Sequence, residues 1–298
     1  MVSNKIQHIV FLALLLINIL TANAAIGDWK AYMSYHDVQE IEQVGNLIFV
    51  QASNSLYVYN KNDQSIQTFS KADYLSDCEI QHIAYNKTTK RLLILYNNSN
   101  IDLMSVSNFE VNNLSDYYTA STIGDKAVND IYMYGKYAYM SNGFGIIKIN
   151  IADGEVCDTY NLGFKVNWCE IKNNHIYAYS ETNGQYSALL NQNLLDKKNW
   201  TKVGDYTAKI HDEKNELKQI VSTLNPGGPK YNYFWGMRLV DNLLYTCGGG
   251  FGHIVDANRP GTIQVLNGDE WQIYEDDIQS QTGVKYIDMN SVDVDPLD

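Results

Sequence analysis

The sequence predicts an all-β protein, specifically a β-propeller of about four-stranded blades. The 298 residues include 23 tyrosines and only 4 prolines, and tyrosine favours strands because it joins a large apolar ring to a polar hydroxyl. Hydrophobic residues make up 45% and charged residues 19% of the chain, a balance typical of a folded globular protein. The third observation, which separates a propeller from other all-β folds, is a pattern that repeats at the length of a blade.

An apolar pair followed by two short apolar runs occurs five times, usually with tight turns between the parts. The copies are Val38/Ile41 with 47–50 and 56–59, Ile80/Ile83 with 92–96 and 101–104, Val128/Ile131 with 137–140 and 145–149, Val166/Cys169 with 175–179 and 186–190, and Phe234/Met237 with 243–247 and 262–266. The second members of these pairs, together with Val292 in a sixth copy, lie 42, 48, 38, 68 and 55 residues apart. These intervals bracket the roughly 40–50 residues of a four-stranded blade. A single antiparallel sandwich, the alternative fold, does not usually repeat one motif five times.

The long interval after the fourth copy indicates an insertion at about 205–230. It combines the polar stretch 211–216 with the Pro/Gly-rich stretch 225–229, so we expect a polar excursion with one helical turn, closed by a tight turn. Five blades and the start of a sixth do not close a ring. We therefore expect 25–298 to be an amino-terminal β-propeller, truncated mid-blade and belonging to a seven-bladed ring.

Residues 1–24 have the features of a secretory signal peptide. Lys5 precedes an apolar run at 9–20, and Thr21-Ala-Asn-Ala24 resembles a cleavage site with small residues. A membrane anchor is the alternative, but Asn18 interrupts the run, which is shorter than the about 20 apolar residues of a spanning helix. We expect an exported protein, in the periplasm or at the outer-membrane surface, with no membrane span in its mature part.

Charge and motifs exclude several function classes. The formal net charge of −12 and the sequence pI near 4.9 disfavour nucleic-acid binding, because an acidic surface repels phosphates. The sequence contains no GxSxG, HExxH or P-loop motif, and no cysteine pair has CxxC spacing. We therefore expect no enzyme activity and no catalytic, cofactor-binding or metal-binding residues.

Four cysteines leave the disulfide state open. Cys78, Cys157, Cys169 and Cys247 are an even number, and export would permit two disulfides. Cys169 and Cys247, however, lie inside apolar, strand-like runs. Buried free thiols are favoured, and disulfides remain the alternative.

Aromatic side chains near the channel are the candidates for ligand binding. Trp168 and Trp235 are interpreted as corresponding residues of the innermost strands in the fourth and fifth repeats, with Asp130 as their counterpart in the third. Tryptophans can stack on sugars, but packing between blades is the favoured interpretation of the two tryptophans. An aspartate does not suit a shared core role, so a ligand site that these three residues form on the channel is kept as the alternative. His82 alternates with apolar residues and is expected to be a half-buried, hydrogen-bonded side chain.

Several short segments of the sequence are more characteristic of one family than the general pattern of a propeller is. They are 75–77, 80–85, 92–96, 100–103, 144–146, 158–160, 162–163, 233–235, 248–250 and 258–261. Together they resemble the amino-terminal propeller of the PorZ family, surface components of the type IX secretion system of Bacteroidetes. The resemblance extends from about Trp29 to Asp298.

The resemblance implies a non-enzymatic binding and scaffold role. Members of the family have two seven-bladed propellers and a small carboxy-terminal β-domain. They act with a PorU-like sortase, which cuts cargo signals and attaches cargo to anionic lipopolysaccharide. The implied partners are therefore this sortase, other type IX components and anionic lipopolysaccharide. This chain ends inside what should be the first propeller.

Two other functions are alternatives. One is the periplasmic glycan-sensing propeller of a hybrid two-component regulator, which usually repeats an Asn-x-x-Asp-x-x-Gly-x-Leu-Trp type phrase that this chain lacks. The other is a secreted propeller acting on polysaccharide, for which no acidic residue stands out as a catalytic group.

Overall fold

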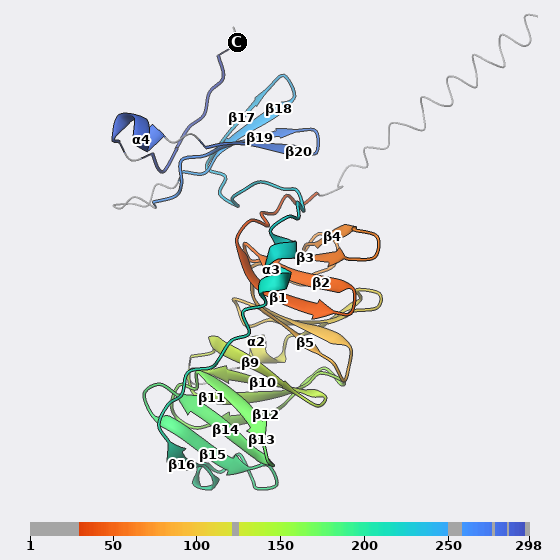
Figure 1. Ribbon diagram of the computed structural model, residues 1–298, viewed down its shortest axis with the longest axis vertical. Coiled ribbons are helices and arrows are strands. Elements are labelled where there is room, and N and C mark those ends of the chain that lie inside the picture. Colours follow the sequence, from red (N-terminus) through yellow and green to blue (C-terminus); the bar gives the residue numbers. More distant parts are fainter. Residues whose placement is uncertain (1–29, 121–124, 250–257, 276–277, 285, 296–298) are drawn as a thin grey trace, which may run out of the picture. The chain divides into compact units, whose positions relative to one another are not determined.

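A computed structural model describes residues 30–120, 125–249, 258–275, 278–284 and 286–295 (Figure 1). The predicted signal peptide lies outside these residues. The chain divides into two units, Met1–Ala31 and Tyr32–Asp298, and all of the sheets belong to the second unit. Across the ranges described, no helix is both long enough and apolar enough to cross a membrane.

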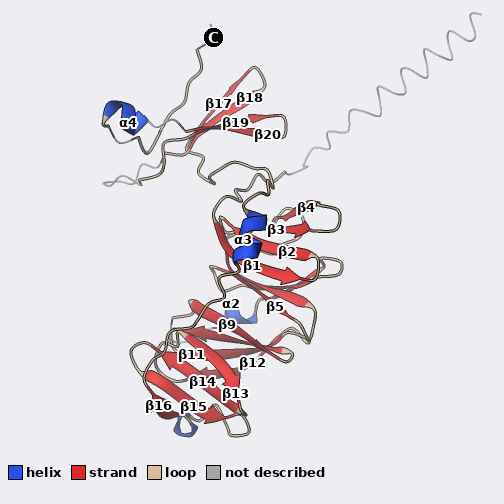
Figure 2. Ribbon diagram, viewed as in Figure 1, coloured by secondary structure: helices blue, strands red, loops and turns tan. Residues whose placement is uncertain are grey.

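The described residues form five four-stranded antiparallel sheets, which confirm the predicted β-propeller class (Figure 2). In each sheet the strands follow their order in the chain, as consecutive hairpins require. The strands of the first two sheets are β1 Val38–Val44, β2 Leu47–Ala52, β3 Ser55–Asn60, β4 Ile66–Phe69, β5 Ile80–Asn86, β6 Arg91–Tyr96, β7 Ile101–Ser105 and β8 Val111–Leu114. Those of the next two are β9 Val128–Tyr134, β10 Tyr137–Asn142, β11 Gly145–Asn150, β12 Glu155–Asn161, β13 Trp168–Lys172, β14 His175–Ser180, β15 Gly184–Leu189 and β16 Thr201–Gly204. The fifth sheet comprises β17 Gly236–Val240, β18 Leu243–Cys247, β19 Ile263–Asn267 and β20 Glu270–Tyr274.

The described helices are short: α2 Asp116–Thr119, α3 Asn215–Val221, α4 Ile278–Thr282 and a single 3₁₀ turn at Lys197–Asn199.

A two-residue turn joins the first strand to the second in four of the five sheets. In the first sheet Val44 pairs with Leu47, so Gly45 and Asn46 form the turn, and the φ of Gly45 is +60°. Turns with positive φ match the right-handed twist of the strands that they join, which explains the choice of glycine and asparagine. The same short connection recurs at Gly135-Lys136, Asn173-Asn174 and Asp241-Asn242.

The first four sheets pack face to face around their first strands. β1 contacts β5, β5 contacts β9, and β9 contacts β13, so these are the innermost strands. The apolar run of β6 explains how neighbouring sheets are held together. Ile94 is buried against the first sheet, whereas the adjacent Leu93 is buried against the third. A strand covered on both faces needs such a continuous apolar run, because its successive side chains point in opposite directions.

Side-chain amides add polar links between neighbouring sheets. Gln51 of β2 donates from Nε2 to the carbonyl of Ile80 at 2.7 Å, and Gln81 donates to the carbonyl of Val128 at 3.1 Å. Asn129 donates to the carbonyl of Val166 at 2.8 Å. These bonds fix the first strand of each sheet relative to the next, because each bond ends on a backbone carbonyl at or just before that strand.

The insertion after the fourth sheet returns to the first sheet, which the sequence did not predict. It does contain the expected helix, although α3 has seven residues, about two turns, rather than one. Val221 is buried in a cluster with Ile48 and Val50, and Leu217 and Ile220 pack against the same cluster. Ile48 and Val50 alternate along β2 with Phe49, which faces the second sheet. α3 therefore covers the face of the first sheet opposite the second sheet, a face on which no other blade packs among the residues that the structure describes (Figure 1).

The segment that leads into the fifth sheet contacts the chain just before the first sheet. The Ser34 hydroxyl donates to the carbonyl of Lys230 at 2.5 Å, and Asn232 accepts from the backbone N–H of Ser34 at 2.7 Å. At the other end of the fifth sheet, the structure assigns no strand to 290–292, so the expected start of a sixth blade is not seen among the described residues. This stretch instead runs past Gly236, where a Cβ atom would lie 3.2 Å from the carbonyl oxygen of Asn290.

Docking of α3 can be tested on the helix itself. We expect Val221→Asp to lower the free energy of unfolding by at least about 2 kcal/mol, because it places a carboxylate in an apolar cluster. The matched change Gln219→Asp, at an exposed position of the same helix, should change it by less than about 0.5 kcal/mol. Urea unfolding followed by tryptophan fluorescence measures both. Equal effects of the two changes would contradict the docking of α3.

Candidate functional site

The innermost strands carry one polar or aromatic residue each at the same position. Glu40, His82, Asp130 and Trp168 directly precede the apolar residues on which the repeat was aligned, and each pairs with the equivalent residue of the second strand. Side chains two residues apart share one face of a strand, so Glu42 and Glu170 lie on this face as well. We call Glu40, Glu42, His82, Asp130, Trp168 and Glu170 the inner-strand site.

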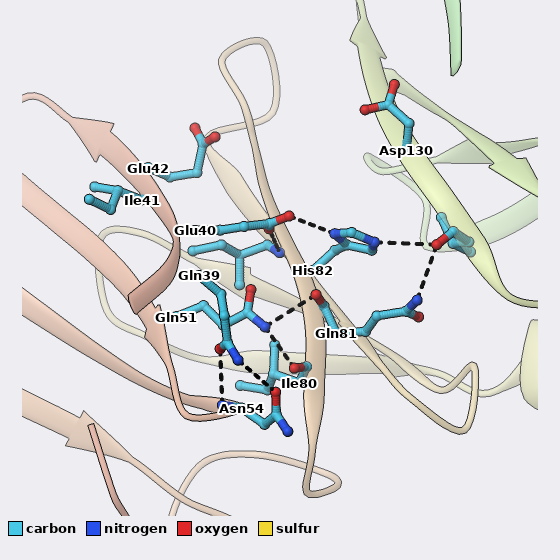
Figure 3. A network of polar contacts seen from close by, with 12 residues as sticks. Gln39, Glu40, Ile41, Glu42, Gln51, Asn54, Ile80, Gln81, His82 and Asp130 are labelled. Atoms are coloured by element: carbon cyan, nitrogen blue, oxygen red, sulfur yellow. Dashed lines mark hydrogen bonds and ion pairs between the residues drawn. The ribbon is translucent and has the colours of Figure 1, made fainter. Parts of the chain in front are cut away.

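Glu40 and His82 link the first three sheets (Figure 3). The Nδ1 atom of His82 lies 2.6 Å from Oε1 of Glu40, and its Nε2 atom lies 3.3 Å from the carbonyl oxygen of Val128. The other oxygen of Glu40 accepts from the backbone N–H of Ile83 at 2.7 Å. An imidazole ring that donates from both nitrogens must be protonated, so this arrangement is suited to the charged form of His82.

The surroundings of His82 favour that charged form. Burial alone would lower the pKa of His82, but the hydrogen bond and the negative charge of Glu40 outweigh it and hold this pKa above its ordinary value. The Val128 carbonyl and the charge of Asp130 act in the same direction. The prediction that His82 is a half-buried, hydrogen-bonded side chain is confirmed.

The two acidic residues nearest the insertion are each paired with a lysine from it. Asp130 Oδ1 lies 2.5 Å from Lys209 Nζ, and Glu42 Oε1 lies 3.3 Å from Lys214 Nζ. Burial raises the pKa of Glu42, and the charge of Lys214 offsets only part of that effect. The second oxygen of Asp130, Oδ2, is buried and has no hydrogen-bond partner.

Trp168 forms the aromatic part of the site. Its ring stacks on that of Tyr179 with centroids 3.7 Å apart and planes 2° from parallel. The Tyr179 hydroxyl donates to Glu170 at 2.8 Å and accepts from Gln185 at 3.1 Å. Burial and the hydrogen bond to Glu170 raise the pKa of Tyr179, so it remains a neutral donor. Trp168 donates from Nε1 to the carbonyl of Thr207 in the insertion at 2.9 Å.

Two cavities lie between the inner strands and the insertion. One, of about 420 Å³, is lined by residues of β1, β5 and β9 and by Lys209 and Lys214. The other, of about 410 Å³, is lined by Trp168, Tyr179 and Glu170 and again by Lys209. Lys209 therefore lines both cavities, of which the first is mainly charged and the second contains the stacked rings of Trp168 and Tyr179.

The structure places Trp168 and Asp130 on neighbouring inner strands, but it does not place Trp235 with them. Trp168 pairs with Tyr179 and Gly236 pairs with Cys247 at the equivalent position, so the prediction that Trp168 and Trp235 correspond was wrong by one residue. A shift of one residue turns a side chain to the opposite face of a strand. Trp235 precedes β17 and is 55% exposed.

Sequence reasoning missed Glu40, Glu42 and Glu170, and it did not connect His82 to this site. A signal was available, because Glu40 and His82 precede Ile41 and Ile83 just as Asp130 precedes Ile131. The lysine partners gave no such signal, because Lys209 and Lys214 belong to the insertion and not to any repeat. Within the described part of the chain, no group of three or more His, Cys, Asp or Glu side chains is arranged to hold a metal ion.

All four cysteines are free thiols in the structure. Cys169 and Cys247 are buried, as expected from their strands, and burial raises the pKa of Cys169 to about 12. Cys78 and Cys157 are exposed, so the expectation of buried thiols was wrong for these two. The disulfide alternative is not seen.

Comparison with known proteins identifies a family match. Residues 48–201, just over half of the chain, match the family described as TSS9, PorZ, N-terminal beta-propeller domain. This range extends from β2 to the first residue of β16 and so covers most of the first four sheets. A comparison with curated proteins gives no match.

Solved structures give a fold match to the same kind of protein. PorZ of Porphyromonas gingivalis, described as an essential bacterial surface component of the type-IX secretion system, aligns with a TM-score of 0.74 at 17% identity. The alignment covers 88% of this chain and 48% of that one, so this chain spans about half the length of that protein. The extracellular domain of a putative one-component system from B. thetaiotaomicron aligns with a TM-score of 0.44 at 14% identity, over 85% of this chain and 34% of that one.

The His82–Glu40 pair predicts a dependence of stability on pH. The folded pKa of His82 lies above the value of about 6.5 for an unfolded histidine. The stabilisation is therefore full below about pH 6.5 and is lost as the pH rises through the folded pKa. We expect His82→Gln to lower the free energy of unfolding by about 1–2 kcal/mol at pH 6 and by less at pH 8.5. A loss of unfolding free energy in His82→Gln that is the same at both pH values would rule out the charged pair.

Thiol labelling tests the state of the cysteines. We expect two thiols, those of Cys78 and Cys157, to react with Ellman's reagent in the native protein, and four to react after unfolding without reductant. Buried thiols are protected because the reactive thiolate is not formed in an apolar environment. Fewer than four thiols in the unfolded, unreduced protein would indicate a disulfide.

Proposed function

The chain belongs to the PorZ amino-terminal β-propeller family of type IX secretion, and from this membership we propose that it is a non-enzymatic binding and scaffold component of that system. The observation that carries the proposal is the family match, which covers three of the four strands that form the inner-strand site, β5, β9 and β13. Stacked sheets with interlocked apolar faces make a rigid support, and a binding site on such a support loses little entropy when a partner docks.

The proposed partners are a PorU-like sortase and other type IX components. In this proposal the propeller supports the sortase while cargo is attached to anionic lipopolysaccharide. We assign the lipopolysaccharide to the sortase side of the assembly, because the carboxylates of the inner-strand site and the net charge of −12 disfavour a polyanion there. The proposed location is the periplasm or the outer-membrane surface, reached through the signal peptide.

Trp168 and Asp130 are proposed as binding residues. Each lines a cavity beside the insertion, and Asp130 has an oxygen without a hydrogen-bond partner. Trp235 is proposed as a separate contact, since it directly precedes β17 and its side chain is exposed.

Recovery of the sortase from cells tests this function. In the bacterium that makes the protein, the tagged full-length protein should retain the sortase after mild cross-linking, and its deletion should leave cargo unattached to the surface. We expect the double change Trp168→Ala and Asp130→Asn to lower sortase recovery at least tenfold while the protein remains abundant.

Tyr134→Ala is the matched control, because Tyr134 is an exposed aromatic residue on the same strand as Asp130 but outside the inner-strand site. Normal cargo attachment in the deletion strain would contradict a role in type IX secretion. Equal sortase recovery with the double variant and with Tyr134→Ala would contradict the assignment of Trp168 and Asp130.

A further inference from the structure

The first part of the insertion, residues 205–214, crosses the inner-strand site, and we call it the strap. It contacts three inner strands in turn. Trp168 of β13 donates to the Thr207 carbonyl, Lys209 pairs with Asp130 of β9, and Lys214 pairs with Glu42 of β1. Lys214 also donates to the carbonyl of Ile41. An extended piece of this chain therefore already lies across the faces that carry the site.

The strap lies loosely on these strands. It contains no helix or strand, and most of its side chains are exposed, with Ile210 exposed to 94%. The cavities of about 420 and 410 Å³ lie beneath it. Because ion pairs between partly exposed groups contribute little to stability, a segment held mainly by Lys209, Lys214 and the carbonyl of Thr207 can be displaced without unfolding the sheets.

The surface beneath the strap is complementary to lysine. Asp130 is 15% exposed in its side chain and keeps one oxygen without a partner even with Lys209 in place. Burial raises the pKa of Glu42, so a second cation beside it would stabilise its charged form. A lysine ammonium has three donors and can bond two carboxylate oxygens or a carboxylate and a carbonyl, as Lys214 does with Glu42 and Ile41.

The inner-strand site and the two cavities beneath the strap together form a groove. We propose that this groove binds an extended, lysine-bearing segment of a partner protein, and that the strap occupies the groove until the partner displaces it. We assign a polypeptide as the occupant because the groove already holds one, the strap. Two lysines of the strap, five residues apart, pair with carboxylates on two different sheets. The inference rests on the proposed binding role of Trp168 and Asp130 and adds the class of ligand that they receive.

The test measures binding of a peptide with the sequence of residues 204–215, labelled with a fluorophore, to the full-length protein. In the variant with Lys209→Gln and Lys214→Gln the tethered strap loses its two ion pairs. We expect this variant to bind the peptide about tenfold more tightly than the wild type, because a tethered competitor acts at an effective concentration near millimolar. Fluorescence anisotropy gives both dissociation constants.

Three controls make the result specific. A peptide with both lysines replaced by glutamine should bind the double variant at least tenfold more weakly. Adding Asp130→Asn to the double variant should weaken binding of the lysine peptide by a similar factor. Lys202→Gln, a change at an exposed lysine of β16 just before the strap, should leave the wild-type affinity unchanged.

A second measurement covers the case of a double variant that folds poorly. In the wild type, excess lysine peptide should speed hydrogen exchange of backbone amides in 205–214 and leave β6 unchanged, whereas the glutamine peptide should do neither. Unchanged exchange with both peptides would overturn the proposal.

Other outcomes also decide the question. Equal binding of the lysine and glutamine peptides, or binding of spermine or an anionic oligosaccharide in place of the lysine peptide, would overturn the assignment of a polypeptide ligand. If peptide binding fails while sortase recovery still depends on Trp168 and Asp130, the ligand class is wrong and the proposed function stands. If the peptide binds but the change of Trp168 and Asp130 leaves sortase recovery unaffected, these residues do not bind the sortase and the groove still binds lysine-bearing segments.

Discussion

The need to cover both faces of the first sheet determines how the rest of this chain is arranged. Its central strands are apolar on both sides, and only one side meets the second sheet. α3 covers the other side, although it lies more than 150 residues further along the chain. A helix of seven residues is not stable alone in water, so the helix and the sheet face stabilise one another. The chain that connects the fourth sheet to α3 must then pass along the inner strands, and this route brings the lysines of the insertion to the inner-strand site.

The inner-strand site depends on repetition. Because the first four sheets share one register, a residue at a given position of the repeat lies at the same level of every inner strand. A glutamate, a histidine, an aspartate and a tryptophan at this level therefore form a continuous surface and not four separate contacts. Acidic groups so close together repel one another and destabilise the folded state unless cations lie beside them. His82, Lys209 and Lys214 supply that charge, and two of the three come from outside the repeat.

The sequence was sufficient to predict what is local or periodic. The five sheets, the helix in the insertion and the half-buried state of His82 follow from alternation, turn residues and spacing. The position of Trp235 was wrong because a loosely spaced apolar pair does not fix register to one residue, and one residue reverses the face. The docking of α3 could not be predicted. Leu217, Ile220 and Val221 define an apolar helix face, but the sequence does not indicate which surface this face covers. The ion pairs of the strap depend on this docking and were missed with it.

The central claim is that the insertion crosses the inner strands, and a double-mutant cycle between Lys209 and Asp130 tests it most directly. The free energy of unfolding is measured for the wild type, Lys209→Met, Asp130→Asn and the double variant. Residues in contact couple by about 0.5–3 kcal/mol, whereas distant residues add to within about 0.3 kcal/mol. The structure requires a favourable coupling in the first range, and additive effects would show that the strap does not lie on the inner strands.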